Sequence, residues 1–339
     1  MNSSANAEYL LNDLLRDVSR SFYLTLRLLP GAVRHQIGLA YLLARATDTV
    51  ADTEAISIEK RLATLQLLRE QIASAAPVKI DLGEVQARQT SDGEKVLLER
   101  INDALALLRE LGPDDRQLVQ QVLETITSGQ ELDLQRFGHV SSNNIVSLQS
   151  FAELDDYTYR VAGCVGEFWT RICVAHLSPK PMMPLEDLIA RGLRFGKGLQ
   201  LVNILRDFPA DLRLGRCYLP REMLDRVSLA PEDLLDPTNE QRLRPTYNEL
   251  LALGEDHLKT AWAYVLALPR SWVRVRLACA LPVLIGVKTL NKLRISNVLN
   301  PDTRIKVSRA EVKRIMRETV MFYPLDSVWK NLPSRVLRA

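Results

Sequence analysis

The chain has 339 residues, which is enough to bury a substantial core in one large domain or two ordinary ones. Its 44 lysines and arginines nearly balance 41 aspartates and glutamates, and the small excess argues against nucleic acid as a partner. Glycine occurs only 15 times, and no run alternates apolar and polar residues as a half-buried strand would. The composition therefore favours an all-α fold.

Helical periodicity recurs along nearly the whole chain. The breaks between periodic segments contain turn-forming residues such as proline and glycine, and none is long enough for an obvious interdomain linker. No internal repeat is visible. We therefore expect one domain over residues 1–339, with helices over residues 7–28, 31–53, 57–75, 94–110, 113–137, 149–177, 185–208, 245–268, 270–293 and 309–320.

Several kinds of site and targeting segment do not fit the sequence. The four cysteines have no CxxC spacing and are expected to be buried thiols, so neither a zinc site nor a disulfide framework is predicted. The first residues include acids where a signal peptide needs a basic segment. The longest apolar run, residues 277–287, is shorter than the roughly 20 residues of a spanning helix. We expect a cytoplasmic protein without a transmembrane anchor.

Asp48 and Asp52 lie four residues apart, so a helix presents both carboxylates to the same side. Apolar residues flank them, whereas a surface helix usually surrounds its charges with other charges. Magnesium prefers oxygen ligands and is often shared between one or two carboxylates and a substrate phosphate. Among 21 aspartates about one such pair is expected by chance, and we interpret the further pair Asp13 and Asp17 as solvated.

Asp207 and Asp211 form a second pair with the same spacing. Gln200 and Asn203 precede them on the same stripe of an otherwise apolar helix. Amides and carboxylates that face a core need a ligand or a hydrogen-bonding partner. This stripe therefore predicts a binding site more strongly than the first pair alone.

Three arginines lie close to the second pair in the sequence: Arg206, Arg213 and Arg216. Guanidinium groups bind phosphate oxygens in a bidentate manner, so the segment suits a diphosphate. The alternative is an internal ion-pair network in which the arginines neutralise the aspartates. Pro209 disfavours helical backbone at the residue before it, so Asp211 is expected to be the less certain ligand of the pair.

Two aromatic segments are further candidates. Ser19, Arg20 and Ser21 have groups that bind phosphate, and Phe22 has a ring that suits a cationic centre. The alternative is a helix whose aromatic residues belong to an ordinary core.

Tyr157 and Tyr159 precede small residues that include Gly163 and Gly166. Small residues either let two helices approach closely or leave room for a ligand. Buried tyrosines more often than not are structural, with each hydroxyl group bonded to a core partner.

Four segments, SRSFYLT, LLARATDTVADT, YRVAGCVGEF and GLQLVNILRDFPADLRLGRCYLP, together resemble the squalene/phytoene synthase family in their order and spacing over residues 19–220. Members of that family are single-domain isoprenoid synthases, helical bundles around a central apolar cavity, and they join two allylic prenyl diphosphates with the help of Mg²⁺. Mn²⁺ is an alternative metal. The resemblance implies that residues 245–320 close the cavity.

The resemblance also assigns roles to residues. It implies the metal ligands Asp48, Asp52, Asp207 and Asp211. It implies a diphosphate-binding set of Ser19, Arg20, Ser21, Arg45, Gln200, Asn203, Arg213 and Arg216. It implies catalytic roles for Tyr157, Tyr159, Phe22 and Arg206.

The family member that the chain resembles most is a bacterial squalene synthase. Residues 281–290 and 304–316 are similar to a C-terminal region associated with NADPH use in squalene synthases, which implies that Lys306 and Arg309 bind this cofactor. Two departures concern Arg160, where eukaryotic squalene synthases have a tyrosine, and Ser308 with Ala310, where they have a basic residue and glycine. Reduction is therefore a weaker expectation than condensation.

The resemblance implies that two farnesyl diphosphates condense to presqualene diphosphate, which is then reduced by NADPH to squalene. The alternatives are a phytoene or dehydrosqualene synthase without a reductive step, or a non-catalytic assembly factor of the same fold. The partner is then a prenyl diphosphate. A lipid product is compatible with peripheral contact at the inner face of a membrane, and the sequence leaves the oligomeric state open.

Overall fold

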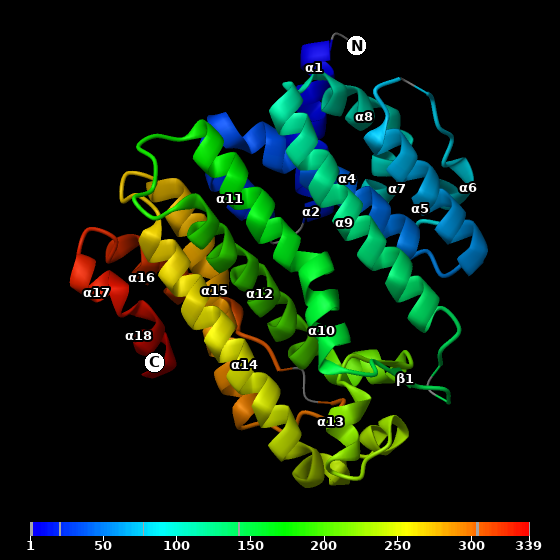
Figure 1. Ribbon diagram of the computed structural model, residues 1–339, viewed down its shortest axis with the longest axis vertical. Helices are drawn as coiled ribbons and strands as arrows, with labels where there is room; N and C mark the ends of the chain where they lie inside the picture. The colour runs from blue at the N-terminus through cyan, green and yellow to red at the C-terminus, as the bar shows by residue number, and fades with distance from the viewer. Residues whose placement is uncertain (1–2, 20–21, 77, 142, 303–304, 339) are drawn as a thin grey trace. The chain divides into compact units, whose positions relative to one another are not determined.

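The computed structural model describes residues 3–19, 22–76, 78–141, 143–302 and 305–338. Helices make up most of these residues, which confirms the all-α fold (Figure 1). The chain divides into two compact units, one formed by Met1–Gly138 with Phe168–Ser178 and the other by His139–Glu167 with Pro179–Ala339. Each unit is described separately below, and the single catalytic domain stays a prediction.

The first unit is organised around α4 (Gly31–Ala51), which packs against α5, α8 and α9. Pro30 precedes α4 and the buried leucines of its inner face hold it in the core. The other elements are α1 (Ser3–Glu8), the π-helix η1 (Tyr9–Leu14), α2 (Leu15–Ser19), α3 (Phe22–Leu28), α5 (Ile58–Ala73), α6 (Gly83–Ala87), α7 (Asp92–Glu99), α8 (Ile101–Glu110), α9 (Pro113–Phe137) and most of α11 (Cys164–His176).

The second unit is organised around α12 (Leu185–Arg213), which packs against α14 (Glu240–Ala267), α15 (Val273–Arg294) and the π-helix η2 (Tyr159–Gly163). Its remaining elements are β1 (Val146–Ser147), α10 (Phe151–Thr158), β2 (Arg216–Cys217), α13 (Arg221–Asp225), the 3₁₀ turns η3 (Pro231–Leu235) and η4 (Pro237–Asn239), α16 (Arg309–Met321), α17 (Asp326–Lys330) and α18 (Leu332–Arg338). The strands β1 and β2 pair in parallel and are only two residues long.

Small residues let η2 and the start of α11 lie directly against α12. A Cβ added to Gly166 would lie 1.8 Å from the carbonyl oxygen of Gly192, and one added to Gly196 would lie 2.0 Å from that of Ala162. No side chain fits at either position. Of the two roles considered for these small residues, the structure shows the close approach of helices.

Helix α12 continues through Pro209 and ends at Arg213, beyond the end at residue 208 that the sequence predicted. Proline lacks the N–H that would donate to the carbonyl group four residues earlier, that of Leu205. The hydroxyl group of Tyr247, which is fully buried on α14, donates to that carbonyl oxygen at 2.7 Å. The tyrosine thus replaces the missing donor, and Asp211 stays one helical turn after Asp207.

Other element boundaries also differ from expectation. Helix α14 begins at Glu240, before the expected residue 245, and residues 94–110 form two helices that meet at Arg100. The expected helix over residues 149–177 contains the π-turn η2. Proline and small residues alone therefore did not locate the helix ends.

The C-terminal helices of the second unit are held by aromatic and cationic contacts. The guanidinium carbon of Arg276 lies 4.6 Å from the ring centre of Trp329 and 5.5 Å from that of Tyr323. The Nζ of Lys288 donates to the carbonyl oxygen of Val336 at 3.3 Å. Both cations are buried, so these contacts fix α17 and α18 against α15.

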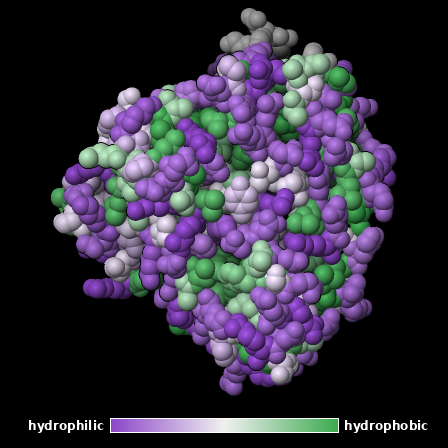
Figure 2. Space-filling view, in the orientation of Figure 1, coloured by the Kyte–Doolittle hydropathy of each residue, from purple (hydrophilic) through white to green (hydrophobic). Residues whose placement is uncertain are grey.

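The four cysteines are free and buried, as expected, and burial raises the pKa of Cys217 to about 12. In the described part of the chain, no helix combines the length and the apolar character that crossing a membrane requires. Figure 2 shows hydrophilic side chains over most of the viewed face, with hydrophobic side chains in separate patches.

Candidate functional site

The first aspartate motif lies at the C-terminal end of α4. Asp48 is in the last turns of the helix, and Asp52 is its C-cap, whose N–H donates to the carbonyl oxygen of Asp48 at 2.9 Å. Arg45 lies one turn before Asp48 and pairs with its carboxylate. The other Nη of Arg45 pairs with Glu94 of α7, a residue that sequence reasoning did not select.

Within the described residues, Arg45 pairs with two carboxylates, those of Asp48 and Glu94, and the charge of Asp52 also acts on Asp48. Incomplete solvation and the charges of Asp52 and Glu94 together raise the pKa of Asp48 to about 6, against the opposing charge and hydrogen bond of Arg45. The Asp48 side chain nevertheless keeps 41% of its surface exposed. The charges of Asp52 and Glu94 therefore act on an accessible carboxylate, which suits a bound cation.

The segment SRSF, residues 19–22, precedes α4 and is only partly described. Ser19 ends α2, and its buried hydroxyl oxygen has no hydrogen-bond partner among the described residues. Arg20 and Ser21 lie outside the described residues. Phe22 begins α3, and its side chain lies outside the described part. Their roles in binding diphosphate or a cation stay predictions.

The second motif lies on α12. The helix carries the predicted polar stripe at its helical spacing, which is given by Gln200, Asn203, Asp207 and Asp211. Asn203 is exposed and the other three residues are half-buried. Because α12 is continuous through residue 213, the two aspartates share one face of the helix.

Arg206 holds the carboxylate of Asp207 in a bidentate ion pair. Its Nε donates to Oδ1 at 2.9 Å and its Nη2 donates to Oδ2 at 2.5 Å. This bond, the charge of Asp207 and that of Asp211 raise the pKa of Arg206 against the effect of burial. The ion-pair alternative considered for this segment is therefore present for Arg206. The Asp207 side chain is still 47% exposed, so its carboxylate remains accessible to a ligand.

The other two arginines of the segment follow Asp211. The Nη1 of Arg213 donates to the carbonyl oxygen of Pro209 at 2.5 Å, so this side chain lies along its own helix. Gly215 then reverses the chain with φ of +82°, and a Cβ there would lie 2.6 Å from the backbone of Ser141. This glycine turn places Arg216 on β2, directly after the helix of the second motif.

The predicted tyrosines have different surroundings. Tyr157 is buried, and its ring stacks on that of Tyr218 with 4.8 Å between centres. Tyr159 is half-buried at the start of η2, and burial followed by the charge of Glu167 raises its pKa. Only the second tyrosine is partly accessible in the described structure. Sequence similarity alone did not distinguish them.

Arg160 occupies the position where eukaryotic squalene synthases have a tyrosine. Its Nε donates to Oδ2 of Asp156 at 2.8 Å, an i to i+4 contact across the junction of α10 and η2. The guanidinium group thus has a structural partner in this chain.

A partly buried polar cluster joins α10, α12 and α14, and the sequence analysis did not find it. The Nζ of Lys197 donates to Oδ1 of Asp155 at 2.7 Å and lies 5.9 Å from the ring centre of Tyr159. The Nε of Arg194 donates to Nδ1 of His257 at 3.2 Å. Burial and these two cations lower the pKa of His257 to about 4, so the imidazole is neutral near pH 7.

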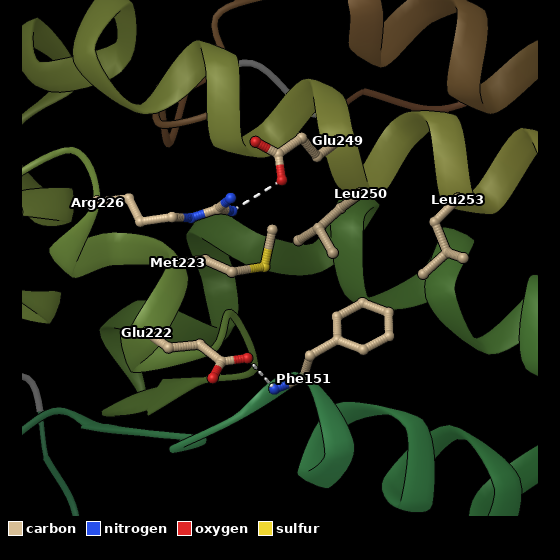
Figure 3. A pocket seen from close by; sticks show the side chains of 7 residues that line it. All are labelled: Phe151, Glu222, Met223, Arg226, Glu249, Leu250 and Leu253. Atoms are coloured by element: carbon tan, nitrogen blue, oxygen red, sulfur yellow. Dashed lines mark hydrogen bonds and ion pairs between the residues drawn. The ribbon is translucent and has the colours of Figure 1, made fainter.

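A pocket of about 510 Å³ lies where α10, α13 and α14 meet (Figure 3). Met223, Leu250, Leu253 and the ring of Phe151 face one another across it. Two polar contacts lie at its edge: Arg226 pairs with Glu249 at 2.7 Å, and Glu222 accepts from the N–H of Phe151 at 2.6 Å. None of the residues that the sequence selected lines this pocket. The central apolar cavity stays a prediction.

The predicted cofactor residues lie before and at the start of α16. Lys306 and Arg309 are exposed, and neither has an ion pair within the described ranges. Ser308 caps the helix: its Oγ accepts from the N–H of Glu311 at 3.2 Å, and Glu311 accepts from the N–H of Ser308 at 2.8 Å. The serine that departs from the squalene synthase pattern therefore starts the helix, and the two cations remain available to an anionic group.

Metal binding by protein groups alone is not indicated. Among the described residues, no three histidine, cysteine, aspartate or glutamate side chains lie together in a way that would hold an ion. The accessible carboxylates of Asp48 and Asp207 do fit Mg²⁺, because this ion takes few protein carboxylates and completes its shell with water and phosphate oxygens.

Comparisons with known proteins concern the family of the chain. The family model for squalene/phytoene synthase matches residues 15–311. The chain is 26% identical to the squalene synthase of Saccharomyces cerevisiae over 84% of this chain and 62% of that protein. It is 32% identical to the 15-cis-phytoene synthase of Synechocystis over 67% of this chain and 59% of that protein. The chain spans less than two thirds of the length of several relatives that it matches.

Solved structures show the same fold. A structure of TcSQS with the ligand E5700 has a TM-score of 0.76, 23% identity and coverage of 98% of this chain and 97% of the other. A dehydrosqualene synthase with a ligand has a TM-score of 0.65, 20% identity and coverage of 95% and 98%. The family match covers most of the sequence, includes both aspartate motifs and agrees with the all-α fold, so the chain belongs to the squalene/phytoene synthase family.

Proposed function

We propose that this protein is a squalene synthase that condenses two farnesyl diphosphates head to head through presqualene diphosphate and then reduces this intermediate with NADPH. The observation that carries the proposal is the pair of helices on which aspartates four residues apart each lie beside an arginine. Membership in the family supports prenyl transfer. Farnesyl diphosphate as the substrate and NADPH-dependent reduction are proposed in addition to prenyl transfer.

In this proposal, the acidic cluster around Asp48 and the carboxylates of Asp207 and Asp211 hold Mg²⁺. The metal, when bound, neutralises charge on the departing diphosphate. Arg206 and Arg216 bind its oxygens, and the arginine charge stabilises the leaving group without needing a proton.

One side chain, that of Tyr159 beside Lys197 of α12, would act on the organic part of the substrate. Tyr159, whose raised pKa keeps its hydroxyl group neutral, offers a polarisable ring and a hydrogen bond beside the reacting carbon atoms. Apolar walls would exclude water from the allylic cation, which water would otherwise trap as an alcohol.

NADPH would be bound by Lys306 and Arg309, whose exposed charges suit the phosphate groups of a dinucleotide. The cofactor supplies a hydride. A dehydrosqualene or phytoene synthase is the alternative, and the observation in its favour is that Ser308 caps a helix where squalene synthases have a basic residue. The protein would act in the cytoplasm.

The decisive experiment supplies purified protein with farnesyl diphosphate, MgCl₂ and NADPH and identifies the extracted products by mass spectrometry. Squalene that forms only with NADPH and Mg²⁺ is the expected result. Dehydrosqualene at saturating NADPH would contradict the reductive step while leaving condensation intact. If the protein formed phytoene from geranylgeranyl diphosphate and no product from farnesyl diphosphate, the substrate would be geranylgeranyl diphosphate instead.

A further inference from the structure

The outward face of α16 carries positive charge. Ile315 and Thr319 are buried and mark the side of α16 that packs against the rest of the second unit. Lys313 and Arg317 are exposed on the other side, and their spacing of four residues places them above one another. Met321 continues this row at the end of the helix.

The acidic residues of α16 do not cancel this charge. Glu311 pairs with Lys292 at 2.8 Å and also accepts from the helix cap, while Glu318 lies 3.9 Å from Arg314. Neither Lys313 nor Arg317 has an ion pair within the described ranges. Lys313 and Arg317 are therefore exposed to solvent, whereas the two acidic residues of α16 pair with other groups.

An apolar tip continues the same face. Val320, Met321 and Leu325 are 56%, 54% and 53% exposed. Arg270 lies beside this tip, because its Nη2 donates to the carbonyl oxygen of Pro324 at 3.4 Å, and its Nη1 is 3.7 Å from the carboxylate of Asp326. We call the set Arg270, Lys313, Arg317, Val320, Met321 and Leu325 the basic–apolar surface. Figure 2 shows hydrophobic patches between hydrophilic side chains at the left, where Figure 1 draws α16 to α18.

The net charge of the protein is concentrated in the same region. Residues 305–338 contain eight lysines and arginines and only three acids, whereas the formal charge of the whole chain is +3. The remainder of the chain is therefore slightly acidic in sum. A partner attracted by charge would meet this end of the second unit first.

We propose that the basic–apolar surface docks the protein on an anionic lipid bilayer. Exposed apolar side chains that are bordered by lysine and arginine bind at the boundary between headgroups and acyl chains, where the cations meet lipid phosphates. Nucleic acid would satisfy the charges but leave Val320, Met321 and Leu325 in water. A bilayer satisfies both halves of the surface.

The experiment measures sedimentation of the purified protein with vesicles, without any substrate. One set of vesicles is phosphatidylcholine alone and the other contains phosphatidylglycerol as well. We expect binding to the anionic vesicles only, and a steep loss when salt is raised from about 0.1 M to about 1 M, because the screening length falls from about 10 Å to about 3 Å.

Two double variants separate the components of the surface. Lys313→Gln with Arg317→Gln is expected to weaken partition into anionic vesicles by about 25-fold. Met321→Ser with Leu325→Ser is expected to weaken it by about tenfold. Both pairs are exposed, and circular dichroism would verify that the variants fold.

Matched variants elsewhere serve as controls. Lys79→Gln with Arg88→Gln changes the net charge equally at exposed positions of the first unit, and Met182→Ser with Ile295→Ser removes apolar side chains that are 103% and 81% exposed. Both controls are expected to bind like the unaltered protein.

Three results would overturn the proposal: no binding to either vesicle, equal binding to neutral and anionic vesicles, or equal losses in the surface variants and their controls. Vesicle binding requires no turnover, so it can succeed or fail independently of the proposed function. Neither substituted pair belongs to the residues assigned to substrate, metal or NADPH.

Discussion

Among the described contacts, the arginine of the α4 motif is shared between two carboxylates, whereas Arg206 of the α12 motif binds one carboxylate with two bonds. On α4, Arg45 is shared by Asp48 and Glu94. On α12, Asp207 has Arg206 to itself in a bidentate pair. The same spacing of aspartates therefore creates two different electrostatic environments. The first suits a metal cation, and the second has positive groups available for diphosphate oxygens.

The largest expected effect tests this difference directly. Asp48→Asn and Asp207→Asn should each lower turnover of farnesyl diphosphate by about 100- to 1,000-fold, because each removes charge needed when diphosphate departs. Asp48→Asn should also raise the Mg²⁺ concentration for half-maximal turnover more than Asp207→Asn does. Steady-state kinetics over a Mg²⁺ series measures both quantities.

Asp13→Asn is the matched control for these variants, because Asp13 also has an aspartate four residues later but is 54% exposed and pairs with Arg16. It should retain full activity. Unchanged turnover in both Asp48→Asn and Asp207→Asn would show that these aspartates do not bind the metal. Equal Mg²⁺ dependence of the two variants would show that the two motifs do not differ in their role.

The second prediction concerns the pH dependence of stability that arises from His257, which accepts a hydrogen bond from Arg194 of α12. The pKa of His257 is lowered from 6.5 to about 4 by burial and by Arg194 and Lys197, against the opposing charges of Asp256 and Asp155. The unfolded chain then binds more protons than the folded chain between these pH values, so stability is lost as pH falls from about 6.5 towards 4. The loss should reach about 3 kcal/mol.

Urea denaturation at about pH 7 and about pH 4.5 measures this loss. His257→Gln keeps an acceptor for Arg194 but does not titrate, so its stability should depend less on pH over this range. Identical pH slopes for the two proteins would refute the role of His257.

A third effect concerns the continuity of α12. Tyr247→Phe should lower the free energy of unfolding by about 1–3 kcal/mol, because it leaves the buried carbonyl group of Leu205 without a donor. Pro209→Ala restores a backbone N–H at the position that bonds to Leu205. The double variant should therefore lose less stability than Tyr247→Phe alone, which a double-mutant cycle measures. Additive losses would show that the hydroxyl group does not replace the missing N–H.

The smallest effect concerns α4. Glu94→Gln removes one of the two carboxylates that hold Arg45, so the guanidinium group loses part of its orientation. We expect KM for the diphosphate substrate to rise about fivefold with little change in kcat, as for a hydrogen bond of about 1 kcal/mol. Glu84→Gln, which breaks the exposed pair with Lys60, is the control and should change neither parameter. A fall in kcat alone would contradict the positioning role of Glu94.

Local periodicity was sufficient for the fold class and for the aspartate stripes. The helix over residues 113–137 was predicted with the observed ends, because Pro113 can occupy the first turn and apolar residues recur at helical spacing. The stripe from Gln200 to Asp211 depends only on spacing within α12. Contacts within one helix are thus readable from the sequence.

Contacts between helices were not predictable in this way. Glu94 lies 49 residues from Arg45, and Asp155 lies 42 residues from Lys197, so no local pattern links the partners. The end of α12 was placed too early because the donor that replaces the N–H of Pro209 comes from Tyr247 on another helix. These three missed features depend on tertiary contacts, not on propensity.

The bond from Tyr247 to Leu205 also makes the order of substitution important. A lineage that loses the hydroxyl group of Tyr247 while Pro209 is present acquires a buried carbonyl group without a donor beside its second aspartate motif. A lineage that first replaces Pro209 by a residue with an N–H can afterwards lose the tyrosine hydroxyl at little cost. Sequence change at these two positions is therefore directional, and an engineer who redesigns α14 should begin with α12.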